Sequence, residues 1–177
     1  MYILSQILVV LSDIFCILSM LSKKKKNVVF YLILSTILFA SHFLCLGGFT
    51  GAAMAFVELV FLIVMYILEV KDKTSYSVHL SIGTIVATII LSIVTWSTWI
   101  SVLPMIAMLV YLIGMMFKNV IIVKSSIFVR LILNGVYMLL LKSYFGAGLT
   151  LVILAFTIVG IVNDYKSKKK IKLEQNN

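Results

Sequence analysis

The sequence has few charged residues for its length, and this scarcity excludes an ordinary soluble fold. Of 177 residues, 12% are charged and 63% are hydrophobic, with a mean hydropathy of +1.19. A soluble domain has about 25% charged residues and is only about half apolar. The apolar residues here form runs of about 17–21, the length that crosses a hydrocarbon core about 30 Å thick. The sequence therefore predicts an integral membrane protein with little mass outside the bilayer.

Catalytic and metal-binding motifs are also missing. The chain contains no HExxH, Gly-x-Ser-x-Gly or Walker-type pattern, and no group of carboxylates beside a nucleophile. Its two cysteines, Cys16 and Cys45, fall at different depths of the expected spans, which argues against a disulfide or a metal site. The first apolar run lacks the basic segment of a cleavable signal. We accordingly expect no enzyme, no cofactor and no metal.

Seven apolar runs are expected to be transmembrane helices, because only helices or closed barrels satisfy backbone hydrogen bonds within lipid. Their short connections are typical of neighbouring antiparallel helices. The fold class is therefore all-α, with expected spans at 2–22, 28–46, 52–70, 78–95, 99–117, 125–141 and 147–163.

The lysines predict the orientation of these spans. The net charge is +9, and every lysine except Lys142 falls on one side of the seven-span topology. Because basic residues are retained in the cytoplasm, we expect the N-terminus outside and the C-terminus cytoplasmic. The clusters KKKK at 23–26 and YKSKKKIK at 165–172 lie at span ends, which favours contact with anionic lipids over nucleic acid. Asp164 is expected to interact with nearby lysines.

The two halves of the chain match each other at a shift of 95 residues, which places Gly51 on Gly146. Turns, span ends and charges fall into register together, and this favours an internal repeat over chance similarity between apolar helices. We expect two parallel three-helix repeats, residues 1–73 and 99–177, the second ending in a basic tail. A linker helix within 74–98 joins them in a 3-1-3 arrangement.

Polar side chains inside the spans indicate where a ligand would bind. Each costs about 2.5–3.5 kcal/mol at the helix centre, so it calls for a partner or a cavity. Arg130, Asn134 and Tyr137 are spaced i, i+4, i+7 and share one face of the sixth span. We expect a substrate site at the bilayer midplane between the repeats, lined by Gln6, Asp13, His42, Arg130, Asn134 and Tyr137.

Depths along the helices predict two pairings. Asp13 and Arg130 each lie about 17 Å from the outer end of their spans at 1.5 Å per residue. We expect them to pair between the repeats, the alternative being that Arg130 snorkels toward the cytoplasm. His42 and Glu58 flank the first outer turn, either as a proton-sharing pair or as a structural hydrogen bond.

Small residues and the single proline indicate how the helices pack. Pro104 falls inside the expected fifth span, as a hinge or as a tolerated kink. Gly114 and Gly135 are expected to allow close packing nearby. On the first span, close packing or a cavity explains the seven-residue spacing of Ser5, Ser12 and Ser19.

Several segments resemble the YgjV-like family of bacterial inner-membrane proteins. They are Gln6 in the first span, HFLCLGGFTGAA at 42–53, LPMIAMLVYLIGMMFK at 103–118 and YMLLLKSYFG at 137–146. The resemblance implies a multi-pass protein of the bacterial cytoplasmic membrane. It also implies kinship with the SWEET and PQ-loop superfamily, in which parallel repeats enclose a midplane site.

The chain departs from the family pattern at two places. Val57 and Val60 stand where the family tends to have an asparagine and an arginine. Tyr137 is followed by Met138, where the family favours an aromatic residue or histidine followed by asparagine. If those polar residues bind a ligand in the relatives, we expect the ligand of this chain to differ from theirs.

The sequence as a whole favours a transporter or facilitator of a small polar solute, working by rocking of one repeat against the other. The alternative is a non-transporting receptor or scaffold of the same fold, since a fold does not determine a function. A weaker alternative is a membrane sensor or immunity-type protein whose basic tail binds a partner. A transporter requires a central cavity lined by both repeats, whereas a scaffold can have a packed apolar centre. A homo-oligomer is compatible with each of these.

Overall fold

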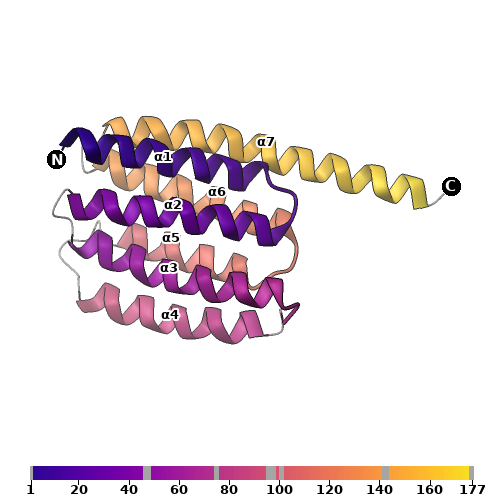
Figure 1. The fold of residues 1–177 in the computed structure, drawn as a ribbon, viewed down its shortest axis with the longest axis horizontal. Coiled ribbons are helices and arrows are strands. Elements are labelled where there is room, and N and C mark those ends of the chain that lie inside the picture. The colour runs from indigo at the N-terminus through magenta and orange to yellow at the C-terminus, as the bar shows by residue number, and fades with distance from the viewer. Residues whose placement is uncertain are drawn as a thin grey trace.

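The computed structural model describes residues 2–45, 49–73, 76–94, 99, 102–140 and 144–175, which form a bundle of helices (Figure 1). Consecutive helices run in opposite directions, so α1, α3, α5 and α7 point the same way. The two predicted outer turns, at Gly47-Gly48 and at Lys142, lie outside the described residues. In order, the helices are α1 (Tyr2–Leu21), α2 (Lys25–Cys45), α3 (Phe49–Val70), α4 (Ser77–Val94), α5 (Val102–Met115), α6 (Val120–Leu140) and α7 (Tyr144–Gln175).

The all-helical prediction is confirmed, with changes at several helix ends. Five of the described helices, α1, α3, α4, α6 and α7, are long and apolar enough to cross a membrane. α5 has only 14 residues, and α2 begins within the KKKK cluster instead of after it. That α2 and α5 also cross the whole membrane, which would complete seven spans, stays a prediction.

Each helix packs against its neighbours in the chain, and α7 also packs against α1. The most extensive contacts join α1 to α2, α2 to α3, α5 to α6 and α6 to α7, whereas α4 packs more sparsely on α3 and α5. The interior is filled by large side chains from both halves. Among those that are almost fully buried are Phe61, Leu62, Met65, Tyr111, Leu112 and Met115.

Glycines bring pairs of helices close together, as predicted. A Cβ atom added to Gly114 on α5 would lie 1.9 Å from Ser126 Oγ on α6. One added to Gly135 on α6 would lie 3.3 Å from Thr150 Cγ2 on α7. The close approach at Gly114 therefore depends on the absence of a side chain.

Pro104 lies in the first turn of α5, which begins at Val102. Proline is tolerated there because the N–H groups of the first turn have no acceptor inside the helix. The predicted span at 99–117 placed this residue further inside a helix. The observed position gives no physical reason for a kink, so a hinge at Pro104 stays a prediction.

α7 continues well beyond the bundle (Figure 1). Its 32 residues would measure about 48 Å at 1.5 Å per residue, against about 30 Å for a hydrocarbon core. The predicted basic tail is therefore a continuation of the last helix. It leaves the bundle at the end that holds the α1–α2 connection and most of the lysines.

Candidate functional site

A charged pair joins the two halves of the bundle near the middle of two helices. Arg130 on α6 donates through Nη1 and Nη2 to the two carboxylate oxygens of Glu58 on α3, with 2.7 Å between Nη2 and Oε2. The side chains of Glu58 and Arg130 are 9% and 20% exposed. The guanidinium carbon of Arg130 also lies 4.5 Å from the ring centre of Tyr111 on α5, which is cation–π geometry. This bidentate pair satisfies both charges, as an ion pair in a low-dielectric interior requires.

The predicted pair of Asp13 with Arg130 is wrong, because Arg130 binds Glu58 instead. The snorkelling alternative is wrong as well, since the guanidinium is held at mid-helix. The depth estimated from the sequence is compatible with Asp13 or Glu58 as the partner of Arg130. Only the arrangement of the helices determines which carboxylate is in contact. Asp13 retains a buried carboxylate oxygen, Oδ2, without a hydrogen-bond partner among the described residues.

The predicted pairing of His42 with Glu58 stays a prediction, and the contacts of His42 described here are with α1 and with its own helix. His42 Nδ1 lies 2.7 Å from Ser5 Oγ and 2.9 Å from the Ser5 carbonyl oxygen on α1. Its ring stacks on Phe39, with 6.0 Å between ring centres. His42 therefore joins α1 to α2 within the first half, which agrees with a structural role.

The other predicted lining residues are spread over different surfaces. Gln6 borders a shallow hollow of about 310 Å³, which it shares with exposed apolar side chains of α1 such as Ile3 and Ile7. Asn134 and Tyr137 are half-buried on α6, on the same side as Arg130. Of the six predicted lining residues, Arg130 alone takes part in the charged pair.

The serines of α1 serve close packing, one of the two interpretations of their spacing. Ser5, Ser12 and Ser19 are all at least 98% buried. Ser12 Oγ donates to the carbonyl oxygen of Ser35 on α2 over 2.9 Å and lies 3.0 Å from its hydroxyl. Small hydrogen-bonding side chains are common where membrane helices approach closely.

A second set of polar contacts lies at the lysine-rich end of the bundle. Lys25, the third lysine of the KKKK cluster, is buried at the start of α2. Its Nζ lies 2.8 Å from Glu69 Oε1 on α3 and donates to the carbonyl oxygen of Met115 on α5 over 3.0 Å. The bond to Met115 joins the first half of the chain to the second.

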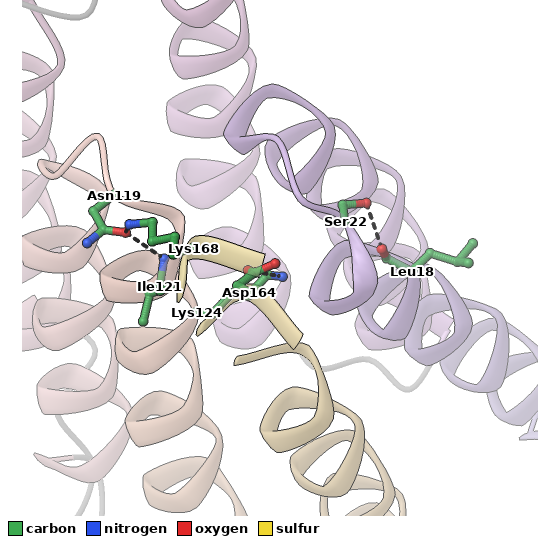
Figure 2. Close-up of polar contacts among 7 residues, drawn as sticks. All are labelled: Leu18, Ser22, Asn119, Ile121, Lys124, Asp164 and Lys168. Carbon is green, nitrogen blue, oxygen red and sulfur yellow. Dashed lines mark hydrogen bonds and ion pairs between the residues drawn. The ribbon is translucent and has the colours of Figure 1, made fainter. Parts of the chain in front are cut away.

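The equivalent end of the second half holds another buried ion pair (Figure 2). Lys124 on α6 is fully buried, and its Nζ donates to Asp164 Oδ2 on α7 over 2.7 Å. Nearby, Asn119 Oδ1 caps the start of α6 by accepting from the Ile121 backbone N–H, and it also accepts from Lys168 Nζ over 2.7 Å. The predicted contact of Asp164 with a lysine is confirmed, but Lys124 lies inside a helix instead of in a loop.

The acidic residues of the two ion pairs are related by the 95-residue shift, whereas their lysines are not. Glu69 and Asp164 are 95 residues apart, and so are Met20 and Met115. The Met115 carbonyl accepts from Lys25 of the first half. The Met20 carbonyl lies 2.2 Å from the place where a Cβ of Gly160 would be, and that place is 3.6 Å from Lys124 Nζ. The last turn of the first helix of each half thus lies against the ion pair of the other half.

The sequence model of the Imp-YgjV family, described as a bacterial inner membrane protein, matches residues 3–168. The match covers nearly the whole chain. The chain belongs to the Imp-YgjV family. No curated protein and no solved structure matches the chain. As a member of this family with several long apolar helices, it is a multi-pass protein of the bacterial inner membrane and contacts the lipid bilayer.

Val57 and Val60, which stand at one of the two places where the chain departs from the expected family pattern, lie on either side of Glu58. Val57 is half-buried, and Val60 is 49% exposed on the lipid side of α3. An apolar residue suits that face of an Imp-YgjV protein. The charged pair itself is one turn or less away on the same helix.

The buried lysines were missed from the sequence because a lysine cluster at a span end indicates topology first. The one available signal was the 95-residue relation between Glu69 and Asp164, which places an acid at the same end of both halves. Among the described residues, no group of three or more histidine, cysteine, aspartate or glutamate side chains could hold a metal ion. The ion pairs found in the described part of the chain thus lie in two layers, one pair at mid-depth and two at the lysine-rich end.

Proposed function

We propose that this Imp-YgjV protein is a transporter or facilitator of a small polar solute, with its site at mid-depth around Glu58 and Arg130. The observation that carries the proposal is the charged pair between α3 and α6. Ionisable side chains deep in a membrane are costly and commonly mark substrate or ion pathways. Because this pair joins the two halves, movement of one half relative to the other would change the contact between Glu58 and Arg130.

The surroundings of the pair support a binding site. Cys16 on α1 packs against the core cluster that contains Tyr111, and Asp13 lies three residues before Cys16 on the same helix. Two carboxylates and one guanidinium leave an unbalanced negative charge when all are ionised. Asp13 Oδ2 and the Tyr111 hydroxyl are buried without a hydrogen-bond partner among the described residues. A proton or a small cationic group such as an amine would balance the charge and use these free polar atoms.

The proposal uses a 3-1-3 arrangement of two repeats, residues 1–73 and 99–177, related to that of SWEET proteins. Support comes from the extensive contacts within α1–α3 and within α5–α7, with α4 packed more sparsely between them. Further support comes from the ion pairs of Glu69 and Asp164 at equivalent positions. Parallel repeats of this kind move as bodies around a fixed central site.

The bonds at the lysine-rich end indicate which contacts would open. Rocking of the halves would break the bond from Lys25 to the Met115 carbonyl and separate Gly160 from Met20. The ion pairs of Lys25 with Glu69 and of Lys124 with Asp164 lie within one half and would stay intact. In the proposed orientation this end faces the cytoplasm, and its exposed lysines contact anionic lipids.

A non-transporting receptor or scaffold is the second candidate, and the packed centre favours it. Phe61 and Tyr111 meet edge to face across the two halves, with 6.4 Å between ring centres. Both are almost fully buried. Such an interior suits a rigid scaffold, which needs no central cavity.

Distance measurements between the halves distinguish the two candidates. Spin labels at Leu21→Cys and Phe117→Cys, in a chain whose own two cysteines are replaced, report the separation of the lysine-rich ends of the two halves. Both side chains are exposed, so the labels disturb no core contact. A transporter should give two distance populations, and Lys25→Met should enrich the longer one. A single narrow distance in both proteins would favour the scaffold.

Solute entry gives the second arm of the test. Proteoliposomes are placed in iso-osmotic glycine, ethanolamine or glucose, and swelling is followed by light scattering. The proposal expects faster swelling than in protein-free liposomes for at least one solute, with loss of the effect in Glu58→Gln. Rates equal to protein-free liposomes in all three, together with a single inter-half distance, would overturn it.

A further inference from the structure

The buried face of α4 consists of hydroxyl side chains. The buried residues of this helix are Ser77, Ser81, Thr88 and Ser92, and Thr84 between them is half-buried. Ile82 and Ile90 on the opposite side are at least half exposed, whereas Leu80 and Ile85 at the edges of the hydroxyl face are half-buried against the core. Small residues commonly let membrane helices approach closely, but α4 packs more sparsely on its neighbours than the other helices do. Close packing therefore does not account for this face.

Three of these hydroxyls lack a hydrogen-bond partner among the described residues. They are Ser81 Oγ, Thr88 Oγ1 and Ser92 Oγ, on residues that are 0%, 1% and 6% exposed. Helix geometry does not prevent such a bond, because Thr84 on the same helix donates to the Leu80 carbonyl over 2.9 Å. A buried hydroxyl left unpaired is destabilising, because it has lost its hydrogen bonds to water. Three unpaired hydroxyls in a row along one helix call for a polar partner.

The neighbouring helix α5 contributes a fourth hydroxyl of the same kind. Tyr111 is fully buried, and its hydroxyl has no hydrogen-bond partner among the described residues. α5 packs against α4, and the Tyr111 ring also lies against Arg130. The unpaired hydroxyls therefore come from two helices, one of which contacts the charged pair.

We propose that the hydroxyl face of α4 lines a narrow file of water molecules between α4 and the α3–α5 side of the bundle. A buried water typically bonds to two to four polar groups, which matches hydroxyls that their own helix leaves unpaired. Ser81 and Ser92 are separated by about 17 Å along the helix at 1.5 Å per residue, which is over half of a hydrocarbon core about 30 Å thick. The file brings water to the depth of the charged pair, whether or not a solute is transported.

Cysteine accessibility to silver ions tests the proposal in proteoliposomes. Ser81→Cys and Thr88→Cys are each made in a chain whose native cysteines are replaced by alanine. Ag⁺ is small, and it reaches thiols only through water. After exposure to Ag⁺, the protein is denatured and the remaining thiols are labelled with a maleimide. Depth-matched controls on the lipid side of the same helix are Ile82→Cys and Ile90→Cys.

A hydrated file predicts that Ag⁺ blocks the hydroxyl-face cysteines about tenfold faster or more than the lipid-side controls, because a thiol in apolar surroundings is inert. Equal protection of both faces would overturn the proposal. A variant without cysteine gives an independent result. Thr88→Val removes one hydroxyl and keeps the shape of the side chain. Loss of a water contact should lower the unfolding midpoint, whereas a raised midpoint would indicate a dry, unpaired hydroxyl and contradict the file.

Discussion

Removing the carboxylate of Glu58 should destabilise the protein more than any surface change, because it leaves Arg130 buried without its partner. Glu58→Gln preserves the shape of the side chain and removes the charge. Both side chains of the pair are less than a quarter exposed, so solvent screens the interaction little. Breaking one side of a buried pair costs about 3–5 kcal/mol. The Tyr111 ring compensates only part of this, at about 1–2 kcal/mol.

The double variant provides the sharper result. Arg130→Met alone leaves Glu58 unpaired and should cost a similar amount. Glu58→Gln combined with Arg130→Met leaves no unpaired charge and should lie within about 1–2 kcal/mol of the native protein, since uncharged replacements of buried pairs are often nearly neutral. The coupling energy between the two positions should therefore exceed about 2 kcal/mol in size, where independent sites differ from additivity by less than about 0.5 kcal/mol.

The free energy of unfolding can be measured by circular dichroism in mixed detergent micelles with increasing SDS. Lys71→Gln serves as control, because Lys71 is exposed at the end of α3 and should change stability by less than about 0.5 kcal/mol. If the two single losses simply add in the double variant, the pair contributes nothing specific. The same result would remove the main support for a mid-depth site.

Three further predictions use other contacts. Gly160→Ala should lower the free energy of unfolding by about 1–3 kcal/mol, since its Cβ would lie 2.2 Å from the Met20 carbonyl oxygen. Gly148→Ala on the same helix should raise the free energy of unfolding by about 0.5–1 kcal/mol, because nothing lies within 4 Å of the added Cβ. If both variants changed the free energy of unfolding in the same direction, the α1–α7 contact would be contradicted. Gly114→Ala should lower the unfolding midpoint, and Ser126→Gly should restore it by removing the opposing side chain; absence of rescue would contradict the α5–α6 packing. Fusion of a reporter that fluoresces only in the cytoplasm to the C-terminus should give signal, and a dark fusion would reverse the predicted topology.

Helix positions were largely predictable from the sequence, because apolar runs of spanning length leave the backbone only one conformation in lipid. The errors are at the ends. α2 begins at Lys25 and α6 at Val120, so lysines assigned to loops lie inside helices. A lysine side chain can be buried at a helix end when an acid of a neighbouring helix meets it, and a single-helix pattern contains no record of that neighbour.

The composition of the site was predictable in part. The sequence singled out Glu58 and Arg130 as ionisable groups of similar depth, and charge alone required each to have a partner. Depth did not show whether Asp13 or Glu58 is the partner of Arg130. It also did not show whether Glu58 pairs with Arg130 or with His42. The hydroxyls of α4 attracted no attention, because serine and threonine are common in membrane helices.

The sequence by itself determined that this chain is a multi-helix membrane protein, where its apolar helices lie and which end carries the positive charge. These properties depend on residue type and spacing along a single helix, so a linear pattern contains them. The tertiary structure alone decided that Arg130 binds Glu58, that Lys25 and Lys124 are buried in ion pairs, and that α4 turns its hydroxyls inward. Partner choice depends on the rotation of each helix about its axis, and that rotation is set by packing among all the helices together.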